Sequence, residues 1–234
     1  MQIEQLSIDL LLRLRKGEDC KELIKRLAQI NPVELLSELS NDEKRKAFWI
    51  NIYNAFIIIF LKSDPRMLDN QQHRYLLFHK KKLIIGNHKL SLNDIIHGIL
   101  RHSKVWWAKG YLSKLFANRF EKKFRTQIFD NRIHFAINYG SKSSPPIRIY
   151  NSAEINHQLD LSANLFMDSE VRFFEEENIV TIPQIFNWYA ADFEGKNGIL
   201  SFLKKYEKIP WNSTPVIIYI PFSWMPEIGN FVNL

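Results

Sequence analysis

Apolar positions in the first sixty residues recur every three to four residues, the spacing of amphipathic helices. This pattern predicts helices over residues 3–15, 20–30, 32–39 and 42–61. Asn41 lies where an N-cap side chain is needed, and Pro65 follows the last of these helices as a stop signal. The N-terminal quarter of the chain is therefore predicted to be helical.

The predicted helix over residues 42–61 is apolar on almost every side, so it should lie at the centre of the fold. Asn51 and Asn54 are three residues apart and share one face, with Tyr53 next to them. Buried amide groups need hydrogen-bond partners, because an unpaired one costs about 1–3 kcal/mol. Either the two side chains tie neighbouring loops to the helix, or one of them reaches a polar pocket.

Beyond residue 75 the pattern changes to short apolar runs between turn residues, which favours strands mixed with helices. Strands are expected at 75–78, 83–88, 132–137, 147–150, 170–174, 178–182 and 215–220, and helices at 95–101, 153–167, 183–191 and 198–206. This order predicts an α+β fold, with a helical N-terminal part packed on a small mixed or antiparallel sheet with further helices. Residues 1–43 should pack as helices on a main domain over 44–228.

Composition and charge narrow the class of protein. The 46% hydrophobic content is that of a globular chain, and the single Cys20 excludes an internal disulfide and a cysteine-based zinc site. The net charge of +7 includes basic runs at 79–82 and 119–125, but no nucleic-acid-binding motif accompanies them, so solvated faces are favoured over a nucleic-acid site. With no secretory signal and no apolar run of about 20 residues, we expect a cytoplasmic protein without a transmembrane segment.

The segment 134–146 has the strongest chemical signal, since a histidine in an apolar run leads into a Gly/Ser loop closed by two prolines. A hydrolase or acyl-transfer site could use Ser144 as nucleophile and His134 as base, with Asp160 or Asp192 orienting the ring. Backbone amides of residues 140–143 would then form an oxyanion hole. The alternative is a histidine satisfied by the backbone and a serine that closes a turn.

Metal binding is less well supported. His97, His102, His134 and His157 are of the right ligand type, but they form no recognisable ligand motif with a carboxylate. We therefore expect no metal and no cofactor.

Five ordered segments carry a resemblance to a known family. The chain resembles the bacterial, plant and animal family called domain of unknown function 547, over about residues 44–228. The segments are Lys46–Ala55, Leu90–Arg101, His134–Pro146, Ile185–Phe193 and Ile220–Trp224. The departures from the family pattern concern reactive residue types. Members commonly have cysteines at Tyr139 and Ser144, a glutamate at Ile96 and an acid at Ser223. The resemblance thus implies a scaffold whose active site has degenerated.

Two functions follow from these observations. The first is a non-catalytic or weakly catalytic module that binds an unknown protein or small molecule in a polar cleft, formed by Asn51, Asn54, His97, Arg101 and Asp192. The second is an enzyme in which Ser144 replaces the cysteine nucleophile.

Trp106 and Trp107 are expected to pack into the core. If they are exposed instead, aromatic rings beside lysines suit contacts with acidic peptides, nucleic acid or lipid head groups.

Overall fold

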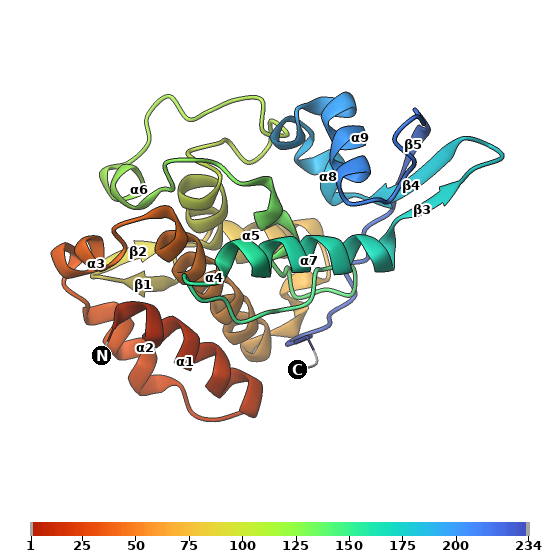
Figure 1. Cartoon of the computed structure of the whole chain (residues 1–234). Helices are drawn as coiled ribbons and strands as arrows, with labels where there is room; N and C mark the ends of the chain where they lie inside the picture. The colour runs from red at the N-terminus through yellow and green to blue at the C-terminus, as the bar shows by residue number, and fades with distance from the viewer. Residues whose placement is uncertain (1, 233–234) are drawn as a thin grey trace.

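The computed structural model of the chain describes residues 2–232 (Figure 1). Its elements are α1 (Ile3–Lys16), α2 (Lys21–Gln29), α3 (Pro32–Glu38), α4 (Asp42–Ser63), η1 (Pro65–Leu68), α5 (Gln71–His79), β1 (Leu83–Ile85), β2 (His88–Leu90), η2 (Asp94–Leu100), α6 (Arg119–Phe124), η3 (Asn131–Phe135), α7 (Ile155–Glu170), β3 (Arg172–Phe174), β4 (Ile179–Pro183), α8 (Ile185–Trp188), η4 (Ala190–Phe193), α9 (Gly195–Lys205) and β5 (Val216–Ile220).

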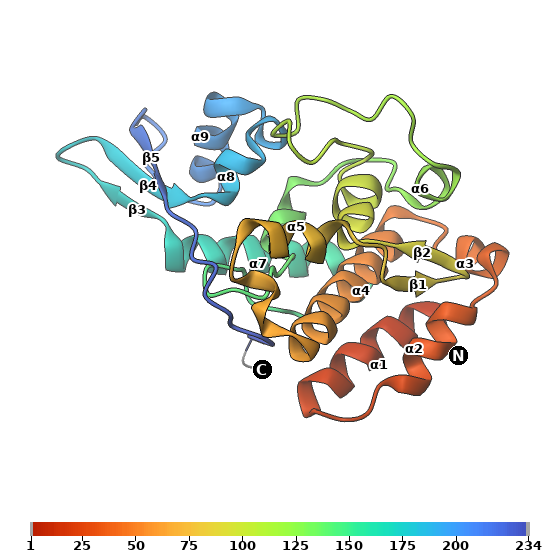
Figure 2. The same ribbon diagram turned by 180° about the vertical axis from the view of Figure 1, so that it is seen from behind.

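Helix α4 forms the centre of the molecule, with α1 along one side and α7 on another (Figures 1 and 2). It begins where Asn41 accepts a hydrogen bond of 3.0 Å from the backbone N–H of Lys44. Its side chains from Lys46 to Ile58 are all buried, because the apolar pattern gives the helix no solvent-facing side. The four predicted N-terminal helices are therefore confirmed, and their bounds differ from the prediction by a few residues at most.

Two small sheets account for the strands. Strands β1 and β2 pair antiparallel through a turn in which Gly86 and Asn87 both have positive φ. The other sheet has the order β3-β4-β5, with β4 antiparallel to β3 and parallel to β5. This small mixed sheet among many helices confirms the predicted α+β class.

Two predicted strands are wrong. Residues 75–78 lie inside α5, which begins where Asn70 accepts a 2.9 Å hydrogen bond from the His73 N–H. Residues 132–137 begin in the 3₁₀ helix η3, where the Asp130 side chain accepts from the Arg132 N–H. Apolar runs of three to five residues have no readable period, so capping side chains decided the structure in both places.

Other predicted elements are shorter or different in kind. The expected helix at 95–101 is the π-helix η2, preceded by a capping box in which Ser91 and Asp94 each bond the other's backbone N–H. The expected strand at 147–150 makes only an isolated bridge between Ile147 and Phe231. The expected helix at 183–191 becomes the short turns α8 and η4.

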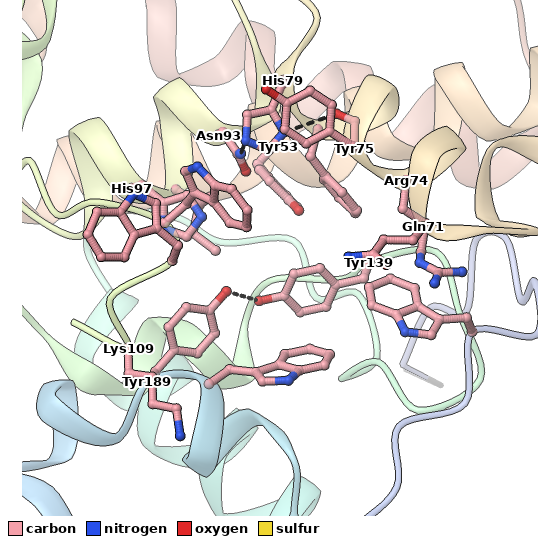
Figure 3. Close-up of a pocket in the computed structure, with 16 residues that line it drawn as sticks. Tyr53, Gln71, Arg74, Tyr75, His79, Asn93, His97, Lys109, Tyr139 and Tyr189 are labelled. Atoms are coloured by element: carbon pink, nitrogen blue, oxygen red, sulfur yellow. Dashed lines mark hydrogen bonds between the residues drawn. The ribbon is translucent and has the colours of Figure 1, made fainter.

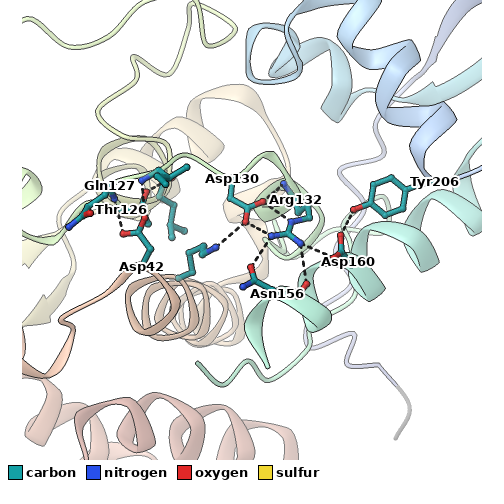
Figure 4. A network of polar contacts seen from close by, with 11 residues as sticks. Asp42, Thr126, Gln127, Asp130, Arg132, Asn156, Asp160 and Tyr206 are labelled. Atoms are coloured by element: carbon teal, nitrogen blue, oxygen red, sulfur yellow. Dashed lines mark hydrogen bonds and ion pairs between the residues drawn. The ribbon is translucent and has the colours of Figure 1, made fainter. Parts of the chain in front are cut away.

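An ion-pair network joins the N-terminal end of α4 to η3 and α7 (Figure 4). Asp130 pairs with Lys46 at 3.0 Å and with Arg132 at 2.7 Å, and Arg132 also pairs with Asp160 at 2.9 Å. Burial acts to raise the pKa of Asp130, but its bonds with Arg132 and Lys46 outweigh burial and lower that pKa to about 2. The network fixes the segment that precedes His134.

Within residues 2–232, no helix has the length and continuous apolar character needed to cross a bilayer.

Candidate functional site

A cavity of about 410 Å³ opens between α4, α5, η2 and the segments around Tyr139, Tyr189 and Trp224 (Figure 3). One wall comes from the irregular segment 103–118, called here the exposed loop, which contributes Trp106, Trp107 and Lys109. The remaining lining residues are Tyr53, Gln71, Arg74, Tyr75, Phe78, His79, Asn93, Ile96, His97, Tyr139, Trp188, Tyr189 and Trp224.

Aromatic rings form most of this lining. Trp188 and Trp224 stack with their centroids 5.8 Å apart and their planes at 23°, and Phe222 packs 4.7 Å from each. The Arg74 guanidinium lies 4.8 Å from the Trp224 ring centroid, a cation–π contact at the rim. The cavity is thus an aromatic one, whereas the sequence predicted a polar cleft.

Three tyrosines supply polar atoms to its inner surface. The hydroxyls of Tyr139 and Tyr189 share a hydrogen bond of 2.9 Å (Figure 3). The hydroxyl of Tyr53 is buried and has no hydrogen-bond partner among the described residues, and it lies near the Tyr139 ring. Burial raises the pKa of all three phenols, so they are neutral hydrogen-bonding groups at neutral pH.

Behind the cavity lies a charged cluster that is almost closed to solvent. Asp192 accepts hydrogen bonds from Arg101 Nε at 2.5 Å, from Arg101 Nη2 at 3.1 Å and from His134 Nε2 at 2.8 Å. Burial acts to raise the pKa of Asp192, but the bonds from His134 and Arg101 lower it to about 2. The carboxylate is therefore charged and fully used by protein donors.

Both histidines of this cluster are held in the neutral form. Burial, followed by the charge of Arg101, lowers the pKa of His97 well below its usual value, and Arg101 Nη1 lies 2.6 Å from His97 Nδ1. Burial also lowers the pKa of His134, against the opposite effect of Asp192. With Arg101 as donor, His97 Nδ1 is an acceptor, which assigns the His97 proton to Nε2.

Tyr189 connects the cluster to the cavity. Its ring stacks on His134 with centroids 4.0 Å apart, and Arg101 lies 4.4 Å above the same ring. His97 belongs to both places, because it lines the cavity and bonds Arg101. Of the predicted cleft residues, His97 alone lines the cavity, while Arg101 and Asp192 lie behind it.

The exposed loop touches this cluster at Gly110. A Cβ atom on Gly110 would lie 2.3 Å from Asp192 Oδ1, and the residue has a φ of +93°. Next to it, the Lys109 carbonyl accepts a 3.0 Å hydrogen bond from the Ala191 N–H. Only glycine fits at this point without displacing the carboxylate.

The structure does not join His134 and Ser144. The Ser144 Oγ accepts hydrogen bonds from the backbone N–H groups of Tyr139 at 3.1 Å and Ser141 at 3.2 Å, and lies 2.9 Å from the Ser141 hydroxyl. Within residues 2–232, no hydrogen bond links this hydroxyl to His134. Asp160 pairs with Arg132, so the carboxylate beside His134 is that of Asp192.

Three of the four proposed oxyanion amides, those of residues 140–142, already have acceptors. The N–H groups of Gly140, Ser141 and Lys142 donate to Asn138 Oδ1 at 2.6 Å, Ser144 Oγ at 3.2 Å and the Met225 carbonyl at 2.9 Å, respectively. These three N–H groups are therefore not free to stabilise an oxyanion.

Asn51 and Asn54 are fully buried and bond backbone groups. Asn51 donates to the Tyr150 carbonyl at 2.8 Å and accepts from the Tyr150 N–H at 3.0 Å. Asn54 donates to the Ala136 carbonyl at 2.8 Å and accepts from the Asn138 N–H at 3.0 Å. The two amides thus hold the segment after His134 on α4.

Several residues of the cavity were either misplaced or not identified from sequence. Trp106 and Trp107 are exposed rather than in the core, so that prediction is wrong. Their segment has no helix or strand to bury them. Tyr53 was noted only as a neighbour of the asparagines, and the meeting of Tyr139 with Tyr189 depends on packing between segments 50 residues apart.

No three His, Cys, Asp or Glu side chains in residues 2–232 converge in a group that could hold a metal ion.

Comparison with known proteins adds a family but no activity. The family model described as "Protein of unknown function, DUF547" matches residues 36–167. This match includes His97, Arg101 and His134 but ends before Asp192 and Tyr189. No curated protein and no solved structure matches the chain.

Proposed function

Because the chain belongs to the protein family of unknown function DUF547, whose description assigns no activity, we propose a function from the site itself. The aromatic cavity binds a small, largely apolar organic ligand that is planar enough to lie against tryptophan rings. The domain acts as a non-catalytic or weakly catalytic binding module.

The aromatic lining of the cavity carries this proposal. A volume of about 410 Å³ falls within the range of small-molecule sites, which are mostly apolar with a few placed polar groups. The unpartnered Tyr53 hydroxyl is such a group, because a ligand atom beside it would recover the hydrogen bond that the protein does not supply. Planar rings of the ligand would gain stacking contacts with Trp188 and Trp224.

Charge at the rim indicates the sign of a ligand substituent. Arg74 and Lys109 line the cavity, and among residues 2–232 no aspartate or glutamate does. Each cation already has a protein acceptor, the Leu68 carbonyl for Arg74 and Asn187 for Lys109. Their contribution is therefore a positive field at the opening, which favours a ligand with an acidic group.

The enzyme alternative has weaker support. The His134–Asp192 pair resembles the base and orienting acid of a hydrolase triad. A nucleophile must stand within hydrogen-bond reach of the base, and the Ser144 hydroxyl instead bonds its own loop. In the part of the chain that the structure describes, no serine or cysteine lines the cavity.

The test uses 1-anilinonaphthalene-8-sulfonate, an aromatic probe with an acidic group, titrated by fluorescence. Gln71→Trp places an indole at the cavity wall, while Gln72→Trp places one on the neighbouring exposed position of α5, outside the cavity. We expect Gln71→Trp to weaken binding at least about tenfold, the loss of about 1.4 kcal/mol, and Gln72→Trp to leave Kd unchanged.

The proposal fails if the wild-type protein and both variants bind the probe with the same Kd, because the cavity would then not be the binding site. Replacing Leu115 and Phe116 by serine serves as a further control, since those exposed side chains could bind the probe elsewhere. This control should leave the Gln71→Trp effect intact.

A further inference from the structure

The exposed loop carries apolar side chains that nothing in the fold covers. Leu115 and Phe116 are 91% and 94% exposed, and Tyr111 and Leu112 are at least half exposed. The loop runs along the edge of the molecule between α6 and the α8–α9 region (Figures 1 and 2). Large apolar side chains grouped on a loop mark a contact surface more often than scattered single ones do.

The same part of the chain is strongly basic. Residues 103–125 contain seven lysines and arginines but a single acidic residue, Glu121. Glu121 is buried and forms a 2.8 Å ion pair with Lys114, so it offsets one of these cations and leaves the segment with a net charge of +6. A partner for this segment must therefore be anionic.

A basic hollow adjoins the loop. It has a volume of about 270 Å³ between β2 and α6, with Lys81, Lys89 and Arg119 among its lining residues and no acid. Arg119 follows Phe116 by three residues, so their Cα atoms are at most about 11 Å apart. Leu115 and Phe116 therefore lie close to the hollow, on the side of the loop that leads into α6.

We propose that the exposed loop and the basic hollow dock this protein on the surface of an anionic phospholipid bilayer. Leu115 and Phe116 enter the boundary between headgroups and acyl chains, and the hollow takes a lipid phosphate. Apolar insertion combined with basic residues is the combination that holds peripheral proteins at such surfaces. Nucleic acid fits less well, because proteins contact it through basic and stacking aromatic side chains. The leucine side chains of the exposed loop supply neither kind of contact.

The first experiment tests the role of Leu115 and Phe116 by co-sedimentation of the protein with sucrose-loaded vesicles. Wild-type protein should bind vesicles of 70% phosphatidylcholine and 30% phosphatidylserine, and bind pure phosphatidylcholine much more weakly. The Leu115→Ser/Phe116→Ser variant should lose at least about tenfold in affinity. Trp211→Ser, which removes a 73% exposed aromatic side chain elsewhere, should bind as the wild type does.

The second experiment tests the charge. Lys89→Gln/Arg119→Gln lowers the net charge by two in the hollow, and Lys25→Gln/Lys196→Gln lowers it by the same amount at other exposed positions. The first pair should weaken vesicle binding about 25-fold, about fivefold per charge, and the second pair much less. Because all four positions are exposed, thermal unfolding should be unchanged.

Three results would overturn the proposal. They are failure of the wild-type protein to sediment with the anionic vesicles, binding of the serine and glutamine variants as tight as that of wild type, and equal binding to pure phosphatidylcholine. A titration with duplex DNA, followed by fluorescence anisotropy, distinguishes binding to a lipid phosphate from binding to the nucleic-acid backbone. DNA affinity above vesicle affinity, unaffected by Leu115→Ser/Phe116→Ser, would assign the surface to nucleic acid instead.

Discussion

Arg101 and Asp192 face each other through two hydrogen bonds of 2.5 and 3.1 Å, with both side chains closed to solvent. Arg101 directly follows η2 and Asp192 lies in η4, 91 residues later in the chain, so their pairing joins the α4 core to the C-terminal helices. A buried ion pair of this kind adds only modestly to the free energy of unfolding, because the cost of desolvating both charges offsets much of their attraction. Removing one partner is a different matter, since the other charge then remains buried alone.

Asp192→Asn should therefore destabilise the fold by about 3–5 kcal/mol, because it leaves the Arg101 guanidinium uncompensated. Urea unfolding followed by circular dichroism measures the change. The control is Asp168→Asn, which breaks an ion pair with Lys208 in which the aspartate is about half exposed. That substitution should cost less than about 1 kcal/mol. If the two substitutions lowered the free energy of unfolding equally, this would contradict the conclusion that the Arg101–Asp192 pair is closed to solvent.

Stability should fall as the pH drops below about 6.5, since the pKa values of His97 and His134 are both lowered in the folded protein. The unfolded chain takes up a proton on each ring near that pH, while the folded chain does not, so protonation favours unfolding. Each histidine adds a slope of about 1.4 kcal/mol per pH unit until its own folded pKa is reached.

His97→Gln should remove one of these two slopes, because a glutamine oxygen can still accept from Arg101 but does not titrate. Urea unfolding at pH 7, 6 and 5 gives the comparison. His157→Gln, at an exposed position of α7, is the matched control and should keep the wild-type dependence. An unchanged slope in His97→Gln would show that His97 is not held neutral.

Gly110→Ala should destabilise the protein more than Gly17→Ala does. Both residues have positive φ, +93° and +73°, so both substitutions carry the strain of a left-handed backbone, about 1 kcal/mol. A Cβ on Gly17 meets nothing within 4 Å, whereas one on Gly110 would meet Asp192 Oδ1 at 2.3 Å. The difference in unfolding free energy should be about 1–3 kcal/mol, the cost of overpacking. Equal losses would show that the loop moves aside freely.

Ser144→Ala should act on stability and leave ligand binding unchanged. The Ser144 Oγ accepts two backbone hydrogen bonds, so its loss leaves buried N–H groups unpaired at a cost of about 1–3 kcal/mol. The Kd for the anilinonaphthalene probe should stay at the wild-type value. Hydrolysis of p-nitrophenyl acetate is the decisive readout, because activity in the wild type that disappears in Ser144→Ala would favour the enzyme alternative.

Helix prediction succeeded where capping residues and periodicity agreed. The α4 start at Asn41 combined an N-cap side chain with a long apolar pattern, and the structure shows both. The segment around His134 had no such agreement, because an apolar run of five residues fits a strand or a turn of helix equally well. There the side chain of Asp130, just outside the run, decided for a 3₁₀ helix.

The site was only partly accessible from sequence for a related reason. Motif resemblance pointed to His97, Arg101 and Asp192, which meet in one cluster. No local pattern shows that this cluster is closed or that the open cavity beside it is aromatic. Both properties depend on side chains such as Tyr53 and Trp224, which are brought together by tertiary packing across most of the chain.

The close packing of Gly110 against Asp192 anchors the exposed loop to the charged cluster. Before Gly110 in the chain are Trp106 and Trp107, which form a wall of the cavity, and after it are the exposed Leu115 and Phe116. The backbone is paired between these two parts, because the Val105 N–H donates to the Leu112 carbonyl at 3.0 Å and the Lys114 N–H donates to the Ser103 carbonyl at 2.7 Å. The surface proposed to meet the membrane and one wall of the aromatic cavity thus belong to the same short, internally paired segment.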